Sequence, residues 1–260
     1  MGKVLAITNR KGGTGKTMTS VSLGASLARQ GKKILIIDAD SQHSATVSLG
    51  VAEPDKLAVS LSTIMQSIIM EQEIDPMKGI ISHDEGISLM PSNNGLAGME
   101  ISLAPIIGRE TVLRQYIDKV RGLYDYILID TAPTLDLLAV NALAAADSVI
   151  TPVAPKYLDA KGLELLLKSI AQTRRHINPK LAIGGILLTM VDKRANITKE
   201  IIAMIKQAYG ESINIFKEAI PHSVRAVEAS TTGKSIFEFD PNGKVALAYA
   251  SLAREVLESA

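Results

Sequence analysis

The sequence predicts an α/β fold with a mostly parallel, twisted sheet and helices on both faces. Five short runs are rich in Ile, Val and Leu and are apolar at consecutive positions, as strands buried on both faces are. Segments with apolar residues three and four apart lie between them, and this alternation favours parallel strands. The expected strands are Val4–Ile7, Ile34–Ile37, Tyr126–Ile129, Ser148–Val153 and Ile183–Met190.

Ligands of such sheets bind outside the carboxyl ends of the strands, so we expect the functional site in the loops after the first two strands. The first of these loops, residues 9–16, leads into a predicted helix over Thr17–Gln30. Gly31 in the position after the helix end, followed by two lysines, predicts its termination. The second loop spans residues 38–43.

The length and composition of the chain exclude several classes of protein and site. A chain of 260 residues favours a single domain over 1–260. The formal net charge is +1, so contact with nucleic acid would need a local basic patch. The absence of cysteine excludes disulfides, Cys-ligated zinc and iron–sulfur clusters, and is consistent with a reducing compartment. The longest apolar stretches fall short of the roughly 20 residues that cross a bilayer, so we expect a soluble protein with no signal peptide.

The glycine-rich loop carries the strongest signal. Residues 9–17 read NRKGGTGKT between a predicted strand and a predicted helix. Glycines let backbone N–H groups turn inward around phosphates, and the helix N-terminus adds positive potential. Lys16 would reach the β- and γ-phosphates, and the Thr17 hydroxyl would bind Mg²⁺. A turn with surface lysines is the alternative, but it does not explain why strand, loop and helix occur in register. The other expected phosphate-binding residues are Gly12, Gly13, Thr14 and Gly15.

Two further predicted strands end in carboxylates. Asp38 and Asp40 lie two apart after the second strand, which places both on one side. A calcium loop is nearly excluded because its sixth and twelfth positions would be His43 and Leu49; a capped strand end remains open. Asp130 closes the apolar run in YDYILIDTAPT and would hold Mg²⁺ through a water, as in a Walker B motif.

The remaining segments are less informative. Residues 53–110 are punctuated by Pro and Gly, so we interpret them as an insertion of short helical pieces. The spacing of apolar residues in Lys244–Leu257 predicts a helix, but its polar face is not that of a basic membrane-surface helix. The four histidines are too scattered for a catalytic or metal-binding arrangement. Arg174, Arg175 and His176 are expected to complement the C-terminal dipole of a helix.

The loop resembles a known motif. KGGTGKT is similar to the deviant Walker A motif of the ParA/MinD/nitrogenase-iron-protein class of P-loop ATPases. The resemblance implies that Lys11 reaches across a dimer interface to the partner's nucleotide. Arg10 stands where most members have Gln, and its role stays open. Asp38–Gln42 resembles the switch I motif D-x-D-P-Q with Ser41 in place of proline. It implies that Asp40 polarises the attacking water and that Asp38 supports the Mg²⁺ shell.

The resemblance extends along essentially the whole chain to the small, chromosomal Soj-like ParA proteins. Thr131, Ala132 and Pro133 resemble switch II, which senses the γ-phosphate. PSNNGLAGMEISL, GILLTMVDKRANIT and the segment from AIPHSVR onward add to the match. It implies adenine contacts from Asp192 and Pro221. It also implies phosphate contacts to DNA from Arg194, Arg225 and Lys244, although each is by itself typical of a solvated charge, and Arg225 has Glu228 three residues on.

The implied function is ATP-dependent DNA segregation with ATP and Mg²⁺. An ATP-bound homodimer would bind double-stranded DNA non-specifically, and a ParB-like centromere-binding partner would stimulate hydrolysis, moving plasmid, chromosome-origin or mobile-element DNA. The protein would be cytoplasmic and nucleoid-associated, and operator-specific repression is not expected, because no helix-turn-helix extension precedes the first strand. Two alternatives are a MinD-like membrane-positioning ATPase, although no basic anchor is visible after Leu257, and a ParA-like protein that positions a protein cargo.

Overall fold

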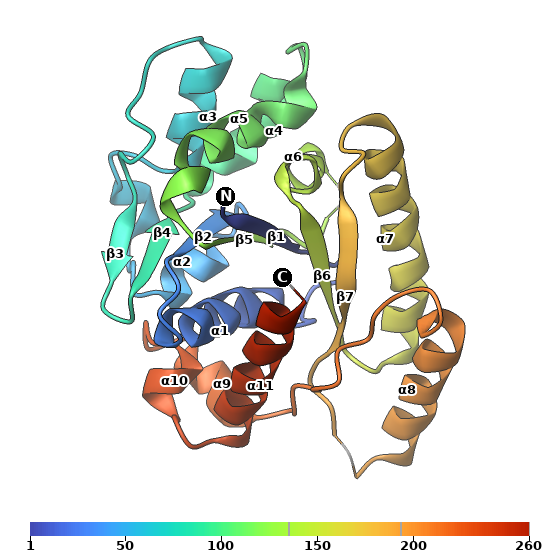
Figure 1. Cartoon of the computed structure of the whole chain (residues 1–260). Coiled ribbons are helices and arrows are strands. Elements are labelled where there is room, and N and C mark those ends of the chain that lie inside the picture. Colours follow the sequence, from blue (N-terminus) through green and yellow to red (C-terminus); the bar gives the residue numbers. More distant parts are fainter. Residues whose placement is uncertain (135, 193, 260) are drawn as a thin grey trace.

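The architecture is a seven-stranded sheet with helices on both faces (Figure 1). The computed structural model describes residues 1–134, 136–192 and 194–259. The strand order is β3-β4-β2-β5-β1-β6-β7, and every neighbouring pair is parallel except β3 with β4. The strands are β1 Lys3–Ile7, β2 Ile34–Ala39, β3 Ile81–His83, β4 Ile87–Met90, β5 Tyr126–Thr131, β6 Ser148–Val153 and β7 Ala182–Leu188.

The predicted strands are confirmed as β1, β2, β5, β6 and β7, with shifts of one or two residues at their ends. The interpretation of residues 53–110 as short helical pieces was incomplete, because this segment also supplies β3 and β4. β4 extends the parallel sheet beside β2, and β3 closes its edge as an antiparallel strand. β3 is only three residues long and none of them is buried, so it leaves no apolar run in the sequence.

Each face of the sheet has its own helical layer. One layer contains α1 (Lys16–Arg29), and the helices near it in Figure 1 include α9 (Val224–Ala229), α10 (Ile236–Phe239) and α11 (Lys244–Glu258). A Cβ on Gly24 would lie 2.9 Å from the Cδ1 atom of Ile36 in β2, so glycine lets α1 approach the sheet closely. The remaining helices are α2 Ser44–Ser48, α3 Leu61–Ile69, α4 Met99–Leu103, α5 Val112–Val120, α6 Leu137–Ala145, α7 Tyr157–His176 and α8 Asn196–Tyr209.

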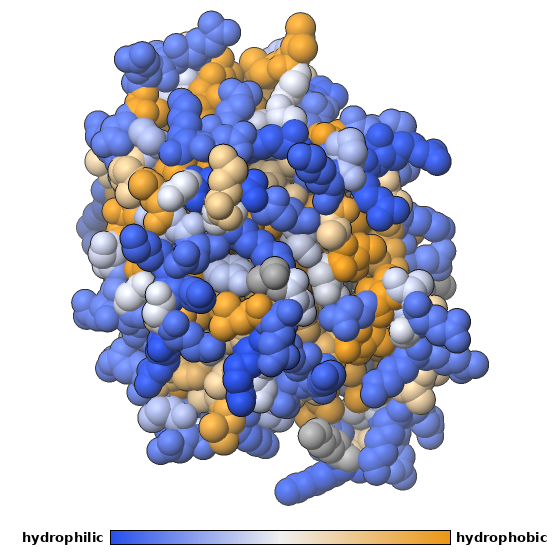
Figure 2. Space-filling view, in the orientation of Figure 1, coloured by the Kyte–Doolittle hydropathy of each residue, from blue (hydrophilic) through white to orange (hydrophobic). Residues whose placement is uncertain are grey.

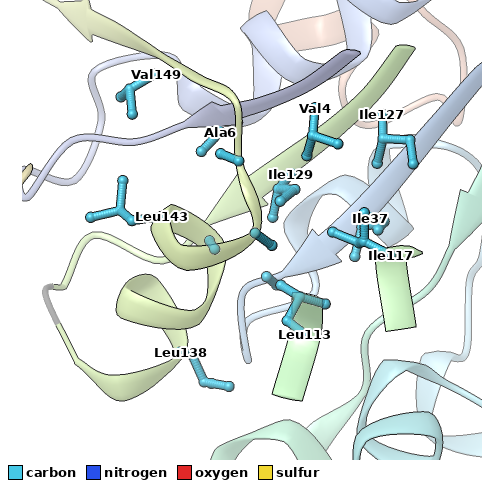
Figure 3. Packing of buried hydrophobic residues seen from close by; sticks show 14 of the residues in the cluster. Val4, Ala6, Ile37, Leu113, Ile117, Ile127, Ile129, Leu138, Leu143 and Val149 are labelled. Carbon is cyan, nitrogen blue, oxygen red and sulfur yellow. The ribbon is translucent and has the colours of Figure 1, made fainter. Parts of the chain in front are cut away.

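The core of the second layer lies between the sheet and α5 and α6. Figure 3 shows side chains of β1, β2 and β5 gathered near those of the two helices. The strands contribute branched residues that alternate between the two faces, so consecutive residues are all buried. Residues in this cluster include Val4, Ala6, Ile37, Leu113, Ile117, Ile127, Ile129, Leu138 and Leu143. Within the described ranges, no helix has the length and the apolar character that crossing a membrane requires.

Candidate functional site

The glycine-rich loop connects β1 to α1 and is fixed on both sides. The Asn9 side chain donates to the Pro152 carbonyl of β6 over 2.7 Å and accepts from the Lys11 N–H over 3.1 Å. The Thr189 hydroxyl, just after β7, donates to the Thr14 carbonyl over 2.7 Å. Gly15 caps α1 with a φ of 84°, a conformation that a residue with a Cβ adopts only under strain. The loop is therefore held in shape by its neighbours before any ligand arrives.

The loop forms part of the wall of a cavity of about 680 Å³ at the N-terminus of α1. Gly12, Gly13 and Gly15 line it. Their backbone N–H groups, like that of Thr14, find no acceptor among the residues that the structure describes. Backbone donors without a protein partner at a helix N-terminus are the groups that bind phosphate oxygens. The cavity thus has the features of a phosphate site.

Lys16 provides a buried cation at this site. Only 7% of its surface is exposed, and its Nζ atom donates to the Lys11 carbonyl over 3.3 Å. Burial lowers the pKa of Lys16, while the neighbouring carboxylates of Asp130 and Asp40 oppose that shift. A poorly hydrated ammonium group gains more from an anionic ligand than an exposed one does. Lys16 is therefore placed to bind phosphate strongly.

Asp130, at the end of β5, is bound to α1 by two hydroxyls. Thr17 Oγ1 donates to Asp130 Oδ2 over 2.8 Å, and Ser20 Oγ donates to Asp130 Oδ1 over 2.8 Å. Asp38 lies beside Asp130 in the register of β2 and β5, and neither residue is exposed. Burial raises the pKa of Asp130 to about 7 and that of Asp38 to about 6. The proximity of the two carboxyls adds to the shift at Asp130.

The pair of oxygen donors Thr17 and Asp130 is suited to a hard cation such as Mg²⁺. The described residues contain no group of three or more His, Cys, Asp or Glu that would hold a metal by themselves. A site with few protein ligands fits Mg²⁺, which keeps waters and shares phosphate oxygens. A divalent cation here would also relieve the cost of burying two neighbouring carboxylates. The donor set therefore fits the predicted ion.

The two carboxylates of the second strand have different environments. Asp38 accepts from the Thr46 hydroxyl over 2.6 Å, from the Thr46 N–H over 2.7 Å and from the Asp40 N–H over 3.1 Å. Asp40 lines the cavity, is 6% exposed and accepts from the Gln42 N–H over 2.9 Å. Asp38 thus binds the Asp40 backbone and Thr46 of α2, whereas Asp40 faces the space beside the glycine-rich loop.

The segments expected to contact adenine lie side by side. Val191 and Pro221 form a parallel backbone bridge, so the segments after β7 and before α9 run together. Pro221 lines the cavity next to apolar residues such as Met190 and Ile220. Asp192 is exposed and is not among the residues that line the cavity; its Oδ1 accepts from the Arg194 N–H over 3.0 Å. Of the two residues, only Pro221 borders the cavity in this structure.

The comparisons with known proteins agree with this geometry. A model of the family AAA_31, an AAA domain, matches residues 2–183. The sporulation initiation inhibitor protein Soj of Bacillus subtilis is 41% identical over 98% of both chains. The chromosome partitioning protein ParA of Caulobacter vibrioides is 34% identical over 98% of this chain and 94% of its own. This chain belongs to the Soj/ParA family of P-loop ATPases. It is a ParA-type partition ATPase.

Solved structures extend the similarity to proteins with bound nucleotide. Cobyrinic acid a,c-diamide synthase from Mycobacterium smegmatis has a TM-score of 0.86 and 32% sequence identity, covering 99% of this chain and 95% of its own. Its crystal structures contain ADP and magnesium in one case and an ATP analog and magnesium in another. The carboxyl ends of β1, β2 and β5 in this Soj/ParA member form the kind of site in which such ligands bind.

Other residues with expected roles lie around the loop of this ParA-type ATPase. Thr131 is 1% exposed, and its hydroxyl donates to the Ile7 carbonyl over 2.9 Å, so it joins β5 to β1. Pro133 of the same segment lines the cavity opposite Gly12. Lys11 is half-buried, and its carbonyl accepts from Lys16. Arg10 is exposed.

The basic residues expected to contact DNA lie outside the cavity lining. Arg194 and Lys244 are exposed, and Figure 2 shows a largely hydrophilic surface over α8 and α11 on the face in view. Arg225 on α9 is 3.7 Å from both Glu228 and Asp240, and its guanidinium lies 4.6 Å from the ring centroid of Phe239. The ion pair with Glu228 that the sequence suggested is therefore present. It leaves Arg225 partly neutralised.

Several residues of the site were missed by sequence reasoning. Ser20 binds Asp130 about one helical turn after Thr17, and a hydroxyl residue three positions on from a predicted ligand in the same helix is a signal that the sequence contains. Thr46, Thr189 and Ser92 reach the site from other segments, and nothing in the local sequence distinguishes them from ordinary polar residues. Only the folded chain brings them to the loop.

Proposed function

We propose that this chain is a Mg²⁺-dependent ATPase that segregates DNA as an ATP-bound homodimer, in the cytoplasm and on nucleoid DNA. A ParB-like centromere-binding partner would stimulate hydrolysis and release the subunits from non-specific double-stranded DNA. Residues 1–260 would act as one domain, since β4 and β3 complete the same sheet that carries the glycine-rich loop. The support for the chemistry is one observation: Lys16, Thr17 and Asp40 line one cavity, and Asp130 lies directly behind its wall, bound to the Thr17 hydroxyl.

Each residue has a role that follows from its position. The backbone of Gly12, Gly13, Thr14 and Gly15 cradles the phosphates, and Lys16 neutralises the β- and γ-phosphates. Thr17 and Asp130 hold Mg²⁺, and Asp38 supports that shell from the neighbouring strand. When bound, Mg²⁺ neutralises charge on the phosphate oxygens. Asp40, which lines the cavity, orients and polarises the attacking water. Thr131 fixes the start of the segment that responds to the γ-phosphate. Pro221 contacts the adenine from the cavity wall, and Asp192, which does not line the cavity in this structure, would join it only if its loop turned inward.

The dimer would complete the site. Lys11 of one subunit would reach the nucleotide of the other, so that ATP binding and dimerisation become one event. The variant Lys11→Ala should still bind ATP but stay monomeric with ATP in light scattering. The matched control Lys180→Ala, an exposed lysine between α7 and β7, should dimerise like the parent. A Lys11→Ala protein that dimerises normally would remove the trans role of Lys11.

DNA binding would follow from dimerisation. Two copies of a weakly basic surface on one particle bind with an avidity that neither has alone. Arg194, Arg225 and Lys244 would contact phosphates without reading bases, which agrees with only nine aromatic residues, six Tyr and three Phe. The Asp40→Ala protein with ATP should retain DNA, and retention should fall steeply as salt rises. Retention that is absent, or insensitive to salt, would contradict the DNA half of the proposal.

A further inference from the structure

Ser92 touches the predicted catalytic loop from a segment to which the proposed function assigns no role. It follows β4 in the motif PSNN and has no exposed surface. Its hydroxyl donates to the Asp40 carbonyl over 2.7 Å. Its N–H donates to the Thr46 hydroxyl over 2.9 Å. Ser92 therefore connects the loop after β4 to Asp40, which follows β2, and to Thr46 in α2.

The contacts of Ser92 belong to a closed network around Asp40. β2 ends at Ala39, so the strand ladder no longer fixes the Asp40 backbone. Asp38 accepts from the Asp40 N–H, and Ser92 donates to the Asp40 carbonyl. Thr46 joins these two contacts, because its hydroxyl donates to Asp38 and accepts from the Ser92 N–H. Both peptide groups that flank the Asp40 side chain are thus held by side chains.

This network determines where the Asp40 carboxylate points. Oδ1 accepts from the Gln42 N–H, while Oδ2 has no hydrogen-bond partner among the described residues, and the residue lines the cavity. A shift of the Asp40 peptide would move that oxygen relative to the phosphate loop. Small displacements of a catalytic group cost large factors in rate. Fixing this peptide is therefore relevant to hydrolysis.

The Asp40 carbonyl does not need Ser92 in order to be satisfied. It also accepts from the His43 N–H over 2.9 Å. Loss of the Ser92 hydroxyl would leave this acceptor bonded, so the expected cost in stability is small. The second bond adds direction: it holds the carbonyl from the side of β4, whereas His43 holds it from within its own turn. Loss of the Ser92 hydroxyl would therefore change the orientation of Asp40 without leaving its buried carbonyl without a hydrogen bond.

We propose that Ser92 is a positioning residue for ATP hydrolysis, acting through the backbone of Asp40. This inference rests on the proposed role of Asp40 in polarising water. Ser92 would set kcat without contacting ATP, and the loop after β4 would thereby become part of the hydrolytic machinery. Motion of that loop would change turnover while leaving nucleotide affinity in place.

The test compares Ser92→Ala, Ser92→Thr and the control Ser62→Ala in the full chain. Ser62 is a buried neighbour whose hydroxyl donates to Asn93 rather than to Asp40. Ser92→Ala should lower single-turnover hydrolysis of Mg·ATP about tenfold, with affinity for a fluorescent ATP analogue within about twofold of the parent. Ser92→Thr, which keeps the hydroxyl, should restore most of the rate. Ser62→Ala should match the parent.

The double variant Ser92→Ala/Asp40→Ala decides between positioning and general destabilisation. If Ser92 acts through Asp40, the double variant should be no slower than Asp40→Ala alone. Two results would overturn the inference but leave the role of Asp40 intact. In one, the rate losses of the two single variants multiply in the double variant. In the other, Ser92→Ala hydrolyses ATP at the parent rate while Asp40→Ala is slow. An Asp40→Ala protein as fast as the parent would overturn the role of Asp40 and the inference with it. Should Ser92→Ala not fold, Ser92→Cys, a poor donor of similar size, should show the same slow turnover.

Discussion

The chain holds two sets of charged groups in opposite ways: the carboxylates at the ends of β2 and β5, and the basic residues before α8 and on α9 and α11. Asp38 and Asp130 have no exposed surface, and each accepts at least two hydrogen bonds from neighbouring segments. Arg194 and Lys244 are exposed. Arg225 has two contacts with carboxylates at 3.7 Å, beyond hydrogen-bond distance.

This difference in burial determines how strongly the loss of one charged group affects ligand binding and stability. A buried charge that loses its partner keeps its desolvation cost, so a single change at the phosphate end has a large effect. An exposed ion pair is worth about 0–1 kcal/mol and is screened by salt. Nucleotide binding at the glycine-rich loop should therefore depend on individual residues, whereas DNA binding at the basic surface should depend on the summed small contributions of several residues. Single substitutions at the two places should separate these behaviours.

The largest effect is expected from Lys16→Ala. The variant removes the buried ammonium group and its charge-assisted bonds to phosphate, each worth up to about 3 kcal/mol. ATP affinity should fall at least about a hundredfold in calorimetric titration. Lys180→Ala, the exposed control, should leave the affinity unchanged. A decrease of less than about twofold in Lys16→Ala would show that the cavity does not bind the phosphates through Lys16.

A smaller effect is expected from Asp130→Asn. The amide keeps the shape of the side chain and an acceptor oxygen but removes the charge that would hold Mg²⁺. The Mg²⁺ concentration required for half-maximal hydrolysis should rise about 10–100-fold, the range typical for groups that orient a metal site. Asp118→Asn, an exposed position on α5, provides the matched control. An unchanged Mg²⁺ requirement would exclude Asp130 as a metal-holding residue.

The same carboxyl predicts a pH dependence of stability without Mg²⁺. Burial raises the pKa of Asp130 to about 7 and that of Asp38 to about 6, against about 3.9 for an unfolded chain. The folded state then holds more protons than the unfolded state between about pH 4 and 7. The free energy of unfolding should therefore fall as pH rises through this window, by up to about 1.4 kcal/mol per pH unit for each proton, and level off above about pH 7.

Urea unfolding of the parent and of Asp130→Asn across this window isolates the Asp130 contribution. The variant lacks this titrating group, so its unfolding free energy should depend less steeply on pH than that of the parent. Equal slopes in the two proteins would mean that Asp130 titrates normally in the folded chain. A flatter slope in the parent when Mg·ATP is added would agree with an ionised Asp130 in the loaded site, because a cation favours the charged carboxylate.

The sequence predicted the structure correctly where the residues of one continuous segment determine its conformation. The pattern of residues 9–17 predicted a strand, a glycine-rich loop and a helix, and the structure has these elements in that order. The central strands were predictable for the same reason, since consecutive apolar residues such as those of Ile34–Ile37 have few uses outside a covered sheet. Right-handed βαβ crossovers then place helices on both faces of such a sheet.

The rest depends on contacts between distant segments. Ser92 lies 52 positions after Asp40, and its hydroxyl is chemically like every other serine in the chain. β3 has no buried residue and is defined by its partner β4, not by its own sequence. The sequence already suggested that Arg225 pairs with Glu228, whereas only the structure brings Asp240 and the Phe239 ring to it. Tertiary neighbours, unlike local pattern, were not predictable.

The smallest effects should come from the basic surface and should differ between its two arginines. Arg194→Ala should weaken the DNA affinity of the ATP-loaded Asp40→Ala protein severalfold, roughly equally on all DNA sequences. It should reduce the salt slope by about one unit for each phosphate that the variant no longer neutralises. Arg225→Ala should have the weaker effect, because Glu228 and Asp240 already offset its charge. Fluorescence anisotropy over a salt series measures both quantities.

Arg175→Ala is the matched control for these two variants. Arg175 is an exposed arginine in the last turn of α7, where it complements the helix dipole, so its removal should leave the DNA affinity nearly unchanged. If Arg175→Ala weakened binding as much as Arg194→Ala, DNA affinity would depend on net charge alone and not on the surface formed by Arg194, Arg225 and Lys244. If Arg225→Ala had the larger effect, the phosphate backbone would be displacing Glu228 and Asp240 from Arg225. The difference between the buried carboxylates and the exposed basic residues would then not describe the protein bound to DNA.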